Sequence, residues 1–163
     1  MKFRILSKTE QEIYDCDAMA ICDYTDVSAL GASLTGNIAL CPGTTNGLQP
    51  ALGTSGTDTL PATFATGLKY VIVDTPFVSG TATSLTVTVG DSGSANRFLT
   101  SSQLQSGQTP ITGAVGTLDR YYAGATEVVN AYFTSVTGNL STFTAGSMRL
   151  FFRMEDLNQL PKT

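Results

Sequence analysis

Residues 84–90 read Ser-Leu-Thr-Val-Thr-Val-Gly, and this stretch decides the class of fold. Because successive side chains of a β-strand point to opposite faces, Leu85, Val87 and Val89 share one face while Thr86 and Thr88 share the other. The apolar face is expected to pack in a core. The hydroxyl face is expected to meet water or a partner.

The same two-residue period recurs along the chain, between connections rich in Ser, Thr, Gly and Asn. No segment has a helical period long enough to cross over between parallel strands, so the pattern predicts an all-β antiparallel β-sandwich, jelly-roll-like, with an irregular N-terminal arm. Residues 1–26 form an N-terminal arm or edge segment, with a short strand followed by a turn of helix or extended chain, and residues 27–163 form the sandwich domain. Residues 27–67 are either a long ordered loop or several short strands. Strands are expected at 3–6, 37–41, 70–74, 85–89, 97–99, 127–133 and 147–154.

Composition limits the partners that the chain can bind. Only 13% of its 163 residues are charged and the formal net charge is −4, which argues against binding nucleic acid, since that needs clustered Lys and Arg. Polarity is carried mainly by hydroxyls and amides, so we expect a surface that packs against other proteins.

The cysteines and the N-terminus indicate the compartment. The chain has three cysteines, Cys16, Cys22 and Cys41, and no histidine to complete a zinc site. We expect reduced, partly buried thiols, no metal and no cofactor, although a Cys16–Cys22 disulfide stays open. The first residues contain no apolar stretch long enough for a signal peptide or membrane span, so we expect a soluble chain made in a reducing cytoplasm, with no membrane partner.

No motif in the sequence supports catalysis, and we predict that the chain is not an enzyme. Residues 90–93, Gly-Asp-Ser-Gly, match the nucleophile signature of serine proteases, but without a histidine base they predict a tight turn. A calcium loop there would lack the carboxylates that a usable site needs. Its ligands would be Asp91, Ser94 and Asn96. A carboxylate-only glycosidase would draw on residues whose spacing selects none of them: Asp74, Asp91, Asp119 and Glu127.

Two groups of residues combine guanidinium groups with aromatic rings, a composition enriched at protein interfaces. The candidate interface residues are Arg120, Tyr121, Tyr122, Arg149, Phe151 and Arg153. The alternative for each group is an ordinary strand edge or a local ion pair. An acidic N-terminal cluster is either a solvated segment or a docking arm for a basic surface. The candidate docking residues are Glu10, Glu12, Asp15 and Asp17.

Residues 70–160 resemble the small β-rich structural proteins of tailed bacteriophage virions. The resemblance rests on residues 85–93, Leu-Thr-Val-Thr-Val-Gly-Asp-Ser-Gly, followed by Arg97-Phe98-Leu99, and on residues 140–146 leading into a terminal strand at 148–154. It implies a capsid decoration, or cement, protein on the outer surface of the virion, which stabilises an icosahedral capsid by bridging neighbouring capsomers. It also implies a homotrimer whose partner is the major capsid protein.

From these expectations we hypothesise that copies associate through exposed sheet faces while the N-terminal segment reaches the capsid floor as an arm. Deletion of residues 1–26 should then abolish capsid binding and leave a folded trimer. The alternative is a carbohydrate-binding β-sandwich module of a head fibre or tail spike. With no Trp in the chain, its sugar-stacking residues would be tyrosines such as Tyr121 and Tyr122.

Overall fold

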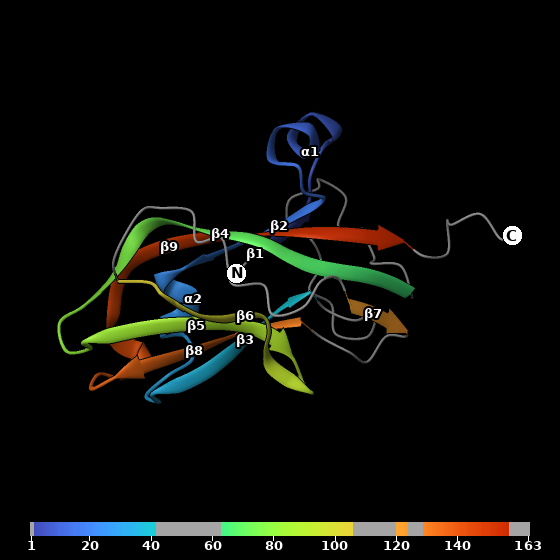
Figure 1. The fold of residues 1–163 in the computed structure, drawn as a ribbon. Helices are drawn as coiled ribbons and strands as arrows, with labels where there is room; N and C mark the ends of the chain where they lie inside the picture. Colours follow the sequence, from blue (N-terminus) through green and yellow to red (C-terminus); the bar gives the residue numbers. More distant parts are fainter. Residues whose placement is uncertain (1, 42–62, 106–119, 124–128, 157–163) are drawn as a thin grey trace, which may run out of the picture.

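The computed structural model describes residues 2–41, 63–105, 120–123 and 129–156. Two antiparallel sheets lie face to face (Figure 1), one of five strands in the order β1-β2-β9-β4-β7 and one of four in the order β3-β8-β5-β6. The predicted all-β antiparallel sandwich is therefore confirmed. Its strands are β1 (Lys2–Ile5), β2 (Ala18–Asp23), β3 (Thr35–Cys41), β4 (Thr63–Ser79), β5 (Ser84–Asp91), β6 (Ser94–Gln103), β7 (Arg120–Ala123), β8 (Val129–Val136) and β9 (Phe143–Asp156). Its helices are α1 (Lys8–Tyr14), α2 (Tyr24–Ser28) and the 3-10 turn η1 (Leu140–Thr142).

Successive strands mostly alternate between the two sheets. Apart from β1 with β2 and β5 with β6, each strand lies in the other sheet from the strand before it. As a result, β9 pairs with both β2 and β4, and β8 pairs with both β3 and β5, so strands far apart in the sequence become neighbours. The last strand thus sits at the centre of the five-stranded sheet.

The main core lies between the sheets and follows the alternation expected from the sequence. Leu85, Val87 and Val89 are fully buried, as are Met148 and Leu150 on the facing strand. The residues between them point outward. β-Bulges interrupt this alternation in the long strand β4, where the register shifts between Leu68 and Tyr70. As a result, Leu68 and Val71 both face the core although they are three positions apart.

The Gly-Asp-Ser-Gly sequence forms the turn between β5 and β6, where Ser92 and Gly93 separate the two strands. The Asp91 carboxylate is 2% exposed and accepts hydrogen bonds from the amides of Gly93 and Ser94. It also lies 2.6 Å from Nε of Arg97. Asp91 therefore holds the hairpin together, and the sequence-based expectation of a turn agrees with its placement.

The N-terminal residues belong largely to the sandwich. β2 pairs with β9 over six residues, β1 pairs with β2 at the sheet edge, and α1 lies between these two strands in the sequence. Of the two readings given for residues 1–26, an arm or an edge segment, backbone pairing places β1 and β2 in the edge of the sheet. A deletion of residues 1–26 would remove two strands and would not be a clean test of docking.

Candidate interaction surfaces

The outer face of the five-stranded sheet carries a second, smaller core. Phe151 is fully buried there, and its ring stacks on Tyr70 at a centroid distance of 4.6 Å and contacts Tyr14 at 5.1 Å. Leu6 and Cys16 from the N-terminal segment close the cluster. The hydroxyl of Tyr70 donates to the backbone carbonyl of Tyr14, and burial raises the pKa of Tyr70 to about 12. Phe151 therefore anchors the protein's own N-terminal segment and is not exposed to a partner, which corrects its expected role.

The two arginines beside Phe151 form ion pairs within the chain. Arg149 binds Asp74 through both Nε and Nη2, with Nη2 2.6 Å from Oδ1, and this hydrogen bonding raises the pKa of Arg149. Arg153 Nη2 lies 3.2 Å from Oδ2 of Asp15. These contacts match the local ion pairs considered as the alternative for this group.

The other interface group, Arg120, Tyr121 and Tyr122, lies in β7 at the second edge of the five-stranded sheet. Arg120 is opposite Thr66 in β4, and Tyr122 is opposite Phe64. The side chains of β7 lie outside the described residues. Their role in an interface stays a prediction.

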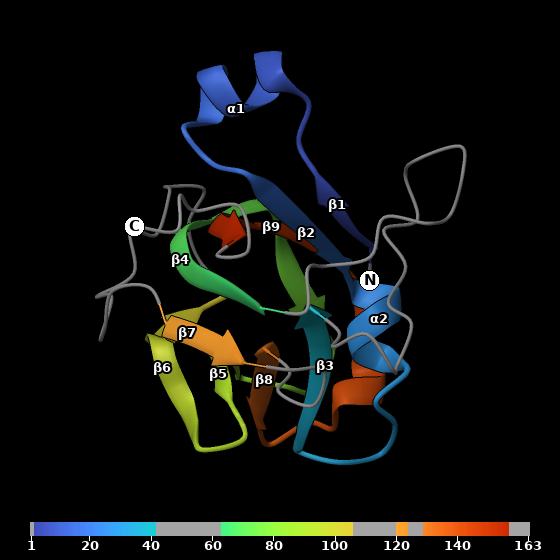
Figure 2. The same cartoon turned by 90° about the vertical axis from the view of Figure 1, so that its right-hand side faces the viewer.

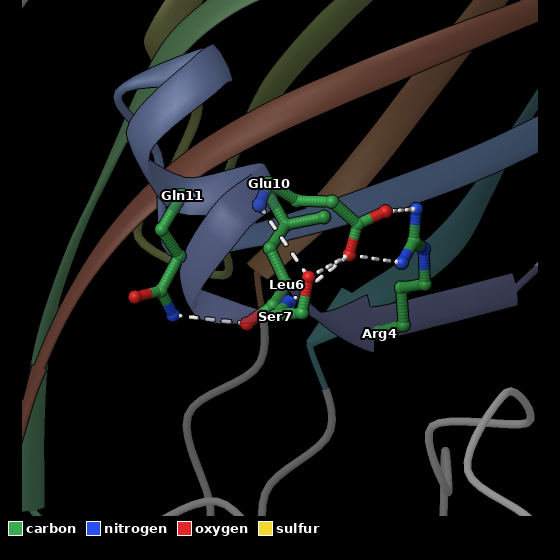
Figure 3. A network of polar contacts seen from close by, with 5 residues as sticks. All are labelled: Arg4, Leu6, Ser7, Glu10 and Gln11. Atoms are coloured by element: carbon green, nitrogen blue, oxygen red, sulfur yellow. Dashed lines mark hydrogen bonds and ion pairs between the residues drawn. The ribbon is translucent and has the colours of Figure 1, made fainter.

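Glu10 of the acidic N-terminal cluster is used inside the chain (Figure 3). Its carboxylate binds both terminal nitrogens of Arg4, at 2.8 and 2.5 Å, and accepts hydrogen bonds from the backbone and hydroxyl of Ser7. Ser7 in turn caps α1, so the two residues form a capping box. Hydrogen bonds from Arg4 and then Ser7 lower the pKa of Glu10 to about 2.

The remaining acidic residues of the cluster differ in their contacts. Asp15 pairs with Lys69 and Arg153, and hydrogen bonding to Lys69 lowers its pKa. Asp17 directly precedes β2, and its amide donates to the Phe152 carbonyl of β9. Among the described residues, Glu12 is exposed and forms no ion pair. A role of Glu10, Glu12, Asp15 and Asp17 in docking to a basic surface stays a prediction.

Helix α1 projects from the five-stranded sheet, as both views of the fold show (Figures 1 and 2). None of its residues is buried, and Ile13 is 70% exposed. The helix is held at its base by the Ser7 capping box, and the side-chain amide of Gln11 donates to the Leu6 carbonyl at 3.0 Å (Figure 3). A seven-residue helix has little stability of its own, so these contacts account for its order.

On the opposite side of the molecule, the four-stranded sheet presents an outer surface that we call the neutral face. It consists of the outward side chains of β3, β8 and β5: Thr35, Asn37, Asn130, Tyr132, Thr134, Val136, Ser84, Thr86 and Thr88. None of these residues is charged. The charged residues described in this sheet, Asp91 and Arg97, lie at the β5–β6 turn and bind each other.

Cross-strand register places the neutral face's hydroxyls in rows. Thr134 lies opposite Thr35 on one side and Thr86 on the other, and Tyr132 lies between Asn37 and Thr88. Thr86 and Thr88 belong to the hydroxyl face expected from the sequence to meet water or a partner, whereas the contributions of β3 and β8 were not expected. The alternation in residues 129–136 was the available signal, since its outward positions carry no charge.

Neither Cys16 nor Cys22 forms a disulfide, and both are buried. Within the described ranges, no three His, Cys, Asp or Glu side chains gather as metal ligands. None of the described helices has the length and apolar character needed to span a membrane.

Comparisons with protein-family models, curated proteins and solved structures find no match for this chain.

Proposed function

We propose that this chain is a virion structural protein that decorates and stabilises an icosahedral capsid by bridging neighbouring capsomers, with the major capsid protein as its partner. The observation that carries the proposal is helix α1, which projects from the sandwich with none of its residues buried. Ordering a backbone costs about 1–2 kcal/mol per residue, and α1 offsets that cost with the capping contacts at its base and with the packing of its last residue, Tyr14, against Phe151. The rest of the helix, including Ile13, leaves its surface open. Such a helix suits contact with a second protein.

The finer fold assignment supports this proposal. With β1 set aside, the sheets have the orders β2-β9-β4-β7 and β3-β8-β5-β6, and the chain passes between them at every step except β5 to β6. We take this order to be a jelly roll, an eight-stranded double sheet found in viral capsid and lectin domains. A fold alone does not assign a function, so the exposed surfaces of this sandwich are what indicate a partner.

The docking contact has an apolar centre in this proposal. Ile13 is 70% exposed at the free side of α1 and Glu12 lies beside it. Full burial of an isoleucine side chain contributes about 1.5–3 kcal/mol, so burial of the exposed part of Ile13 contributes about 1–2 kcal/mol per contact. Contacts of this size are weak singly, and a capsid presents many identical sites.

The test is co-sedimentation of the purified chain with bare capsids of the phage that encodes it. Ile13→Lys should weaken binding at least tenfold, because it places a charge in the contact. The matched control is Val78→Lys, since Val78 is also an exposed β-branched residue, 52% exposed, and lies far from α1 in the sequence. Equal binding by Ile13→Lys and wild type would refute α1 as the docking element, and absence of wild-type binding would refute the proposed function.

The carbohydrate-binding alternative rests on Tyr121 and Tyr122, whose side chains lie outside the described residues. Apart from the jelly-roll order, which lectin domains share, no feature of the described residues favours it.

A further inference from the structure

We propose that two copies of this chain pair through their neutral faces, which makes a two-ended bridge with a helix α1 at each end. This inference rests on the proposed function for the role of α1, but the pairing itself does not. In Figures 1 and 2, α1 lies above the five-stranded sheet and the four-stranded sheet lies on the other side of the sandwich. Pairing the neutral faces therefore directs the two α1 helices away from each other.

The chemistry of the neutral face fits a second copy of itself. In a two-fold contact a patch packs against the same patch of the second copy. A charged side chain in it would either face the same charge of the second copy or be removed from water without an opposite charge to pair with. Hydroxyl and amide groups both donate and accept hydrogen bonds, so they are compatible with their own copies. Within the described part of the chain, the hydroxyls of Thr88 and Thr134 make no hydrogen bond and are available for such contacts.

The opposite outer face does not meet this condition. It carries the ion pairs of Asp74 with Arg149 and of Asp15 with Lys69, and its apolar residue Phe151 is covered by the N-terminal segment. A second copy placed there would have to remove charged side chains from water. The neutral face is therefore the better surface for self-association.

The area of the neutral face determines the expected affinity of the dimer. Three strands about 4.8 Å apart and about seven residues long, at about 3.3 Å per residue, give roughly 330 Å² per copy. The pair would bury roughly 660 Å² in total, well below the roughly 1,200 Å² at which stable interfaces begin. We therefore expect a weak dimer, with a dissociation constant of about 10 µM or higher, whose bridging becomes effective when both ends are held on a shell.

The test is sedimentation velocity of the full chain from about 5 to 500 µM, a range chosen to span the expected affinity. The neutral-face pairing predicts a shift from the 17.1 kDa monomer toward twice that mass. Thr134→Lys should weaken the dimer at least tenfold, because it places two like charges in the contact. Thr134→Val, which adds no charge, and Thr9→Lys on the exposed part of α1 should leave the dimer intact.

A chain that stays monomeric at 500 µM on that scale, forms a stable trimer, or dimerises equally well with Thr134→Lys would overturn the pairing. Capsid binding reports separately on the proposed function. A dimer sensitive to Thr134→Lys that binds no capsid would retain the pairing and refute the function. Capsid binding by a strict monomer would retain the proposed function and refute the pairing.

Discussion

Truncation of Phe151 tests whether the N-terminal segment is anchored as part of the fold. Phe151 is fully buried, stacks on Tyr70 and contacts Tyr14, so Phe151→Ala removes a whole ring from the small core under that segment. Phe→Ala substitutions in cores cost about 3–5 kcal/mol, and a peripheral site that can partly collapse belongs at the lower end. We expect a loss of about 3 kcal/mol in the free energy of unfolding, or about 6–12 °C in Tm for a chain of this size.

The assay combines urea unfolding, followed by circular dichroism, with native-state hydrogen exchange. Exchange should accelerate in β1, α1 and β2 more than in β5, because β5 packs in the main core and not against Phe151. Phe151→Leu, which keeps an apolar side chain, should cost about 1 kcal/mol. A loss below about 1 kcal/mol for Phe151→Ala, with unchanged exchange in β1 and α1, would refute the anchoring role.

Three further perturbations test particular contacts. The pKa of Glu10 is about 2 in the folded protein, below its ordinary 4.5. Its ionised carboxylate therefore stabilises α1 above pH 4.5, and this stabilisation is lost as the pH falls toward 2. Hydrogen exchange of α1 should accelerate over that range, and Glu10→Gln should abolish the pH dependence. Ser102 is 6% exposed with an unpartnered hydroxyl, whereas Ser135 is 3% exposed and donates to a backbone carbonyl. Ser102→Ala should therefore change the free energy of unfolding by less than about 0.5 kcal/mol or increase it, whereas Ser135→Ala should lower it by about 1–2 kcal/mol. Equal losses for the two variants would contradict the different roles of the two hydroxyls. Asp91→Ala leaves Arg97 without its buried partner and should cost about 3 kcal/mol in urea unfolding, and a cost below about 1 kcal/mol would contradict the hairpin role of Asp91.

The fold class was predictable because period-2 alternation is a local signal. Leu85, Val87 and Val89 share one face of their strand, and Met148, Leu150 and Phe152 share one face of theirs. The structure buries both faces between the sheets. Strand order was not predictable, because pairing of β9 with β2 and β4 depends on contacts between distant residues. The strand β2 was missed because both of its faces are covered, by the main core on one side and the N-terminal cluster on the other, so it shows no polar alternation.

The candidate surfaces were less predictable than the fold. Arg149, Phe151 and Arg153 share a face, as the alternation indicated, but the sequence could not show that residues 6–16 cover that face. Glu10 was recognisable as more than a solvated acid, since Ser7 and Glu10 have the spacing of a capping box. The exposure of Ile13 follows from the orientation of α1, which no local pattern determines.

The most direct test of capsid bridging is electron cryomicroscopy of bare capsids incubated with the full chain. Capsid bridging predicts added density between neighbouring capsomers, with α1 in contact with the shell, and loss of that density with Ile13→Lys but not with Val78→Lys. Capsids that acquire no density at saturating protein, or density attached through a surface other than α1, would contradict it.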